Sequence, residues 1–89
     1  MTLKEYIQEK RKEYEGKKIP SSIANRWDER VVGQGFDQKG ATGVKEYLEK
    51  YGRGIKAPKC VHFALHAEAE GHNDMAQVFW VKAFELETA

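Results

Sequence analysis

Cys60 and His62 are the residues whose types most readily suggest covalent chemistry, because a thiol beside an imidazole can act as a nucleophile. They lie two positions apart in a segment whose apolar spacing predicts a helix. Helical neighbours are rotated by about 100°, so these two side chains point roughly 200° apart and cannot exchange a proton. Cys60 is also the only cysteine, which excludes an internal disulfide. We therefore expect a buried thiol, and we expect that the chain is not an enzyme.

A metal site is the second chemistry that the residue types raise. His62, His66 and Glu70 recur every four residues, so they share one side of the predicted helix. Two histidines at this spacing can share a metal ion if further ligands come from elsewhere. The alternative is an ordinary solvated helix face, and we favour it. The sequence predicts no metal and no cofactor.

The glycine-rich stretch 33–43 resembles a phosphate-binding loop in the spacing of Gly35 and Gly40. Ala41 stands where such a loop requires a lysine, and the chain is too short for the parallel sheet that the loop needs. Nucleotide hydrolysis is therefore excluded. A weaker hypothesis remains, in which backbone N–H groups at the start of the next helix hold an anion.

Basic residues are concentrated before position 60. Residues 1–59 contain 14 Lys and Arg against 9 Asp and Glu, whereas residues 60–89 contain one against five. Such a distribution can attract a phosphate backbone, or it can let one half of the chain dock on the other. Glutamates interleave with the lysines, and the net charge is only +1. Nucleic-acid binding is thus our alternative function, with candidate residues Lys10, Arg11, Lys12, Lys17, Lys18, Arg26 and Arg30.

Five helical segments are expected to position these residues. Thr2 and Glu5 form a capping-box pattern for a first helix that ends near Gly16. Apolar residues at helical spacing predict further helices over 22–32, 42–51, 58–70 and 73–87. We expect Ser21 or Ser22, Thr42 and Asn73 to cap three of them. A short strand over 27–32 is the competing interpretation of the second segment, and Phe36 is expected to anchor the loop that follows.

The segment 73–87 is the most informative part of the sequence, because only Gln77, Lys82 and Glu85 interrupt its apolar surface. A helix that is apolar on nearly all sides is normally buried. We therefore predict an all-α fold: a compact bundle of four to five short helices with this segment at its centre. The turn 71–73 is so short that the last two helices must form an antiparallel hairpin. Residues 1–89 are expected to form a single domain, with residues 1–18 docked most loosely.

Small residues recur along the last two predicted helices and their turn, at Ala64, Gly71, Ala76 and Ala83, and one large aromatic, Trp80, lies among them. In this placement the two helices resemble a single hairpin of the tetratricopeptide-repeat family. The resemblance implies close antiparallel packing of the two helices. That family stacks about three or more copies of its repeat, whereas this chain has one such unit. We take from it the hairpin geometry alone.

The favoured function is that of a small soluble interaction module, namely an adaptor, accessory subunit or inhibitor that binds another protein. No catalytic set is assembled, and the last helix has more apolar surface than its thin neighbours can comfortably cover. Trp80 and Phe84 are the expected interface anchors with Gln77 beside them, unless they belong entirely to the core. A homodimer is one way to cover such a surface. No apolar run is long enough to span a bilayer, so we expect no membrane association and a cytoplasmic location.

Overall fold

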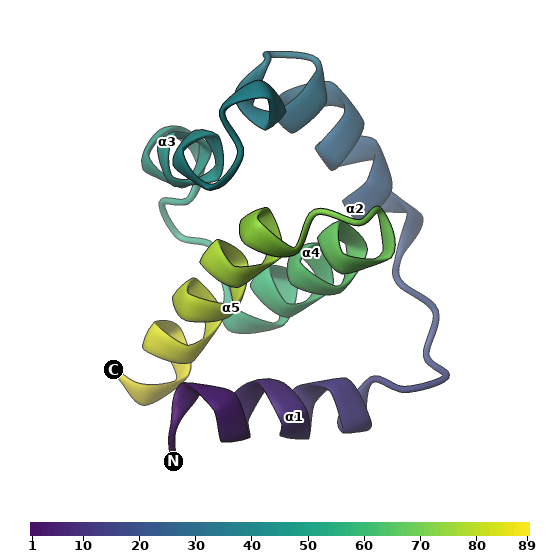
Figure 1. Ribbon diagram of the computed structural model, residues 1–89, viewed down its shortest axis with the longest axis vertical. Helices are drawn as coiled ribbons and strands as arrows, with labels where there is room; N and C mark the ends of the chain where they lie inside the picture. Colours follow the sequence, from purple (N-terminus) through teal and green to yellow (C-terminus); the bar gives the residue numbers. More distant parts are fainter.

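The computed structural model describes residues 1–89 and confirms the all-α prediction, with helices throughout and no strand (Figure 1). Two short segments depart from α geometry: a π-helical turn and a 3-10 turn, labelled η1 and η2. None of the helices combines the length and the apolar character that crossing a bilayer requires. The elements are α1 (Leu3–Glu13), α2 (Ser21–Arg26), η1 (Trp27–Val32), η2 (Phe36–Lys39), α3 (Ala41–Tyr51), α4 (Ala57–Ala69) and α5 (Asn73–Thr88).

The predicted C-terminal hairpin is confirmed, with α4 and α5 side by side in Figure 1. Gly71 lies in the turn between them with φ +82°, a conformation that residues with a Cβ rarely adopt. Within the hairpin, the rings of Phe63 and Phe79 stack with their centroids 5.0 Å apart. Buried alanines on both helices, including Ala64 and Ala76, allow the backbones to approach closely.

Trp80 belongs to the core. The sequence left open whether it is a core residue or an exposed interface residue, and its burial rules out the second alternative. Its side chain is 1 % exposed, and the ring of Tyr6 from α1 packs edge-on against it. The indole Nε1 donates a hydrogen bond of 3.0 Å to a carboxylate oxygen of Glu68 on α4. Three elements thus share this residue, so none of its surface is left for a partner.

Helix α1 crosses the hairpin near the C-terminal end of α5 and contributes Tyr6 and Ile7 to the core (Figure 1). Ion pairs add to this apolar contact. Arg11 pairs with Glu68, and the Lys10 Nζ lies 3.3 Å from a carboxylate oxygen of Glu87. The basic N-terminal half therefore docks on the acidic C-terminal half at this point, as the charge distribution allowed.

The second helix is present, and the competing strand interpretation of 27–32 is wrong. Its hydrogen bonding changes at Trp27, where a π-helical turn begins, and Gly33 N donates to the carbonyl of Asp28. Trp27 and Val31 are buried on the inner side of this turn. Arg26 and Arg30 are displayed together on another side.

The capping predictions are confirmed in one case of four. Thr2 and Glu5 form the reciprocal capping box, with backbone-to-side-chain distances of 2.9 and 3.2 Å. The N-cap positions of the other three helices lie one or two residues earlier than expected, at Pro20, Gly40 and His72, and none of these residues makes a side-chain cap. Ser21, Ser22, Thr42 and Asn73 therefore lie within the helices that they were expected to cap.

The glycine-rich loop is shorter than expected because η2 occupies residues 36–39. Phe36 is half-buried and packs edge-on against the ring of Tyr47, with centroids 5.9 Å apart, so its predicted anchoring role is confirmed. At the end of the loop, buried Gly43 brings α3 directly against η2.

Candidate functional site

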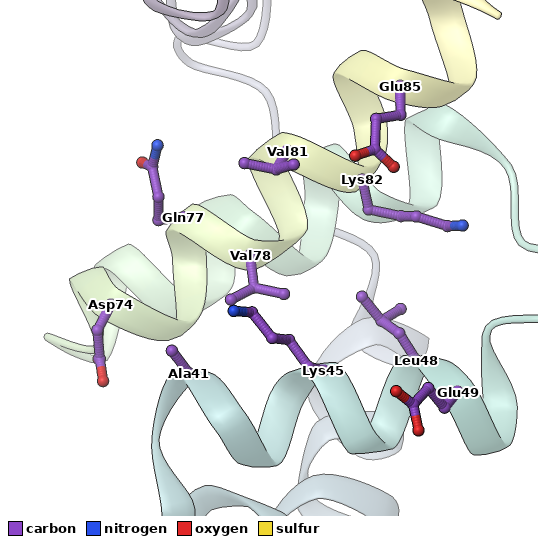
Figure 2. Close-up of a pocket in the computed structure, with 10 residues that line it drawn as sticks. All are labelled: Ala41, Lys45, Leu48, Glu49, Asp74, Gln77, Val78, Val81, Lys82 and Glu85. Carbon is purple, nitrogen blue, oxygen red and sulfur yellow. The ribbon is translucent and has the colours of Figure 1, made fainter.

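A groove of about 620 Å³ runs between α3 and α5 (Figure 2). Leu48 projects from α3 toward α5, and Val78 projects from α5 toward α3. Val81 lies one turn further along α5, and all three side chains are half-buried. Together these three residues form the apolar floor of the groove.

Charged residues of both signs surround this floor. Lys45 and Lys82 supply positive charge, and Glu49, Asp74 and Glu85 supply negative charge. None of the five forms an ion pair within the chain. The rim is therefore free to pair with charges of either sign on a bound segment.

The groove exists because α5 is apolar on more sides than its neighbours cover. Helix α4 covers the side that carries Phe79 and Ala76, and α1 covers the side that carries Trp80 and Phe84. Val78 falls on the remaining sector, which faces α3 across the groove. We expected α5 to have more apolar surface than its neighbours cover, and this sector is the part that stays uncovered.

The predicted interface residues are separated by the fold. Gln77 is exposed at the groove, whereas Phe84 is half-buried against the ring of Tyr6, with centroids 5.3 Å apart. Trp80 is buried in the core. The sequence analysis did not identify Leu48, Val78 and Val81 as a site. Val78 and Val81 could have been recognised, because they form the apolar sector of 73–87 that lies opposite the aromatic residues.

A second cavity, of about 500 Å³, is strongly basic, and we call it the basic pocket. It lies where α2, η1, the end of α3, the linker after Gly52 and the start of α4 meet. No aspartate or glutamate lines it. Its cationic residues are Arg26, Arg30, Arg53, Lys56 and Lys59, with His62 beside them.

Two tyrosines of α3 complete the lining of the basic pocket. Tyr47 is only 3 % exposed, and burial raises the pKa of its hydroxyl while Arg30 and Arg26 oppose that rise. Tyr51 is half-buried, and the Arg30 guanidinium lies 4.6 Å from the centroid of its ring. A hydrogen bond of 2.6 Å from Gln34 lowers the pKa of Tyr51.

The candidate nucleic-acid residues divide into three groups. Lys10 and Arg11 are engaged in ion pairs with acidic residues of α1, α4 and α5. Lys12, Lys17 and Lys18 are exposed along the end of α1 and the linker after it. Arg26 and Arg30 line the basic pocket. The sequence missed the three partners of these arginines, which are Arg53, Lys56 and Lys59.

The histidines do not converge. The ring of His62 packs edge-on against Tyr14, and burial lowers its pKa. His66 and His72 both pack against Trp27. No three His, Cys, Asp or Glu side chains are placed to hold a metal ion together.

Cys60 is fully buried on the inner side of α4, and burial raises the pKa of its thiol to about 11. The start of α3, which could have held an anion, instead lies beside the carboxylate of Asp74, next to Gly40. That position is therefore less suited to an anion than the basic pocket.

Comparisons with known proteins identify no relative: no family model, no curated protein and no solved structure matches this chain.

Proposed function

We propose that this protein is a small cytoplasmic interaction module that binds one amphipathic helix of a partner protein in the groove between α3 and α5. The observation that supports the proposal is the apolar floor of Leu48, Val78 and Val81, which remains half-exposed in an otherwise well-covered core. A groove between two helices is a common site for the apolar face of a third.

The dimensions of the groove favour a short segment over a whole domain. Helix α3 has 11 residues and is therefore about 16 Å long, which matches about three turns of a bound helix. Three aliphatic side chains form too small a floor for a standard protein–protein interface, which buries about 1,600 Å². We therefore expect a transient complex with a dissociation constant on the order of micromolar.

The rim defines the chemistry of the partner helix. It should carry aliphatic residues at i, i+3 or i+4, and i+7, because these share one face. Charges of both signs should flank that stripe, because the rim itself presents Lys45 and Lys82 together with Glu49 and Glu85. A second copy of this chain is the competing occupant, and light scattering with and without the peptide distinguishes the two.

The proposal is tested with a displayed library of amphipathic helical peptides whose aliphatic and flanking positions are varied. We expect the enriched peptides to share the aliphatic spacing described above and to shift the methyl resonances of Leu48, Val78 and Val81. Val78→Asp should weaken binding at least about tenfold, because it would bury an unpaired carboxylate under the peptide.

Leu86→Asp is the matched control, because Leu86 is an exposed aliphatic residue of the same helix outside the groove. It introduces the same charge and should change the affinity by less than about twofold. Circular dichroism must show that both variants remain folded. Enriched peptides that shift residues elsewhere, or equal losses in both variants, would rule out the groove as the binding site.

A further inference from the structure

The five cations of the basic pocket are not neutralised within the chain. Arg26, Arg30 and Arg53 form no ion pair, and neither do Lys56 and Lys59. The basic residues of α1 differ in this respect, since Lys10 and Arg11 pair with glutamates. Like charges that converge on one cavity repel one another and raise the local positive potential. An anionic ligand would relieve this repulsion.

Tyr47 offers a hydrogen-bond donor to a ligand in the basic pocket. Its side chain is 97 % buried, because only 3 % is exposed, and it lines the basic pocket. Its hydroxyl is influenced by burial and by the charges of Arg30 and Arg26, and no hydrogen bond within the chain engages it. The buried side-chain oxygens without a partner belong to Tyr6 and Asp37 and not to Tyr47, so the Tyr47 hydroxyl keeps access to the solvent in the pocket. A ligand in the pocket can accept a hydrogen bond from this free hydroxyl.

The start of α4 adds to the positive potential on the same side. Lys56 is the N-cap of this 13-residue helix and makes no side-chain cap, so backbone N–H groups of the first turn are left without an intrahelical partner. Helix N-termini carry a partial positive charge that favours anions. Lys56, Pro58 and Lys59 all line the pocket, which places this end of α4 at its wall.

We propose that the basic pocket is a binding site for phosphate groups, supplied either by a small nucleotide-like molecule or by a strand of nucleic acid. Arginine guanidinium groups match phosphate oxygens through paired hydrogen bonds, and two lysines add charge without a fixed geometry. Five positive charges are more than one phosphate group can neutralise, so we expect the ligand to carry at least two phosphate groups. The pocket volume of about 500 Å³ lies within the usual range for small-molecule sites.

The basic pocket is distinct from the groove, although α3 borders both. Tyr47 and Tyr51 face the pocket, whereas Leu48 faces the groove. The two proposals can therefore fail separately. Val78→Asp, which disrupts the groove, should leave phosphate binding unchanged.

Binding is measured by NMR, through the arginine Nε–Hε and tyrosine ring resonances, with two probes: inorganic tripolyphosphate and a single-stranded five-nucleotide oligonucleotide. We expect saturable shifts at Arg26, Arg30 and Tyr47. Saturation by tripolyphosphate alone would identify a small phosphorylated ligand, and tighter binding of the oligonucleotide would identify a strand. Failure of both probes to saturate would overturn the proposal.

Three variants separate the pocket from general surface charge. Arg53→Gln removes an exposed pocket cation and should weaken binding about tenfold, with the salt dependence for the oligonucleotide falling by about one unit of log–log slope. Tyr47→Phe removes only the hydroxyl and should weaken binding about threefold. Lys12→Gln removes the same charge from exposed α1 and should have little effect. Equal losses in Lys12→Gln and Arg53→Gln would show that binding is non-specific and would overturn the proposal.

Discussion

Gly43 shows how one residue positions both candidate sites, because it determines how closely α3 approaches η2. It is buried in the first turn of α3, and a Cβ at this position would overlap the carbonyl oxygen of Phe36. The same contact places Phe36 against Tyr47, which lines the basic pocket. Backbone contact of this kind tolerates no side chain.

Gly43→Ala should therefore destabilise the protein by about 1–3 kcal/mol, although alanine is the better helix former. The free energy of unfolding from chemical denaturation measures this effect. Thr42→Ala is the matched control, since Thr42 is exposed and does not cap α3, and its effect should stay within about 0.5 kcal/mol. A stabilised Gly43→Ala variant would show that α3 and η2 are further apart than described.

Helix capping illustrates what a local pattern can and cannot predict. The Thr2–Glu5 pattern was interpreted correctly because both partners lie in the same turn and need nothing else. Thr42 was misplaced because the path of the chain through Gly40, with φ +59°, determines where α3 begins. That path depends on packing against η2, which the capping pattern does not contain.

At the scale of elements, the docking of α1 decides the role of α5. Tyr6 is 2 % exposed and lies between Trp80 and Phe84, so α1 covers the aromatic side that was expected to bind a partner. Burial, with Glu87 nearby, raises the pKa of the Tyr6 hydroxyl, which has no hydrogen-bond partner of normal geometry. The contact is thus mainly apolar.

Tyr6→Ala should cost about 3–5 kcal/mol, because it removes a buried aromatic ring from this contact. It should also increase the solvent exposure of Trp80, which a red shift of tryptophan fluorescence and faster acrylamide quenching would report. Gln8→Ala changes an exposed residue of the same helix and serves as the control. If Tyr6→Ala unfolded no more readily than Gln8→Ala, α1 would not be part of the core.

The π-helical turn is one of two elements that the sequence did not predict, the other being η2. Apolar residues at Ile23, Trp27 and Val31 recur every four positions, which suits both α and π geometry. The spacing therefore predicts a helix but not its hydrogen-bonding pattern. In the folded chain this turn presents Arg30 to the same pocket as Arg26, the last residue of α2, and π turns are often found at functional sites.

At the scale of the whole molecule, Cys60 reports on the single core. It is 0 % exposed within a cluster that includes residues from α1 through α5. Reaction with a thiol reagent needs both exposure and the thiolate, and the buried thiol has its pKa raised to about 11. The packing around Cys60 must therefore open before the thiol can be modified.

At pH 8, a disulfide reagent should label Cys60 on the order of a thousandfold more slowly in the native protein than in denaturant. Phe79→Ala should accelerate labelling, and the logarithm of the rate should rise in proportion to the loss of stability. The pKa of the Cys60 thiol is higher in the folded protein than its ordinary value of about 8.5, so the protonated thiol favours the folded state. Its contribution to the free energy of unfolding is complete below about pH 8.5 and is lost as the pH rises toward 11. Rapid labelling without loss of helical circular dichroism would show that the core opens locally.

The sequence by itself determined the helical class, the approximate extent of five helices and the C-terminal hairpin, because apolar spacing and turn residues such as Gly71 act over a few neighbouring positions. Only the tertiary structure decided that Trp80 is core and that Val78 with Leu48 forms a groove. It also decided that Arg26 and Arg30 meet Arg53, Lys56 and Lys59 in one pocket. Each of these arrangements joins residues from different helices, and side-chain packing between helices depends on distances and angles that no local pattern contains.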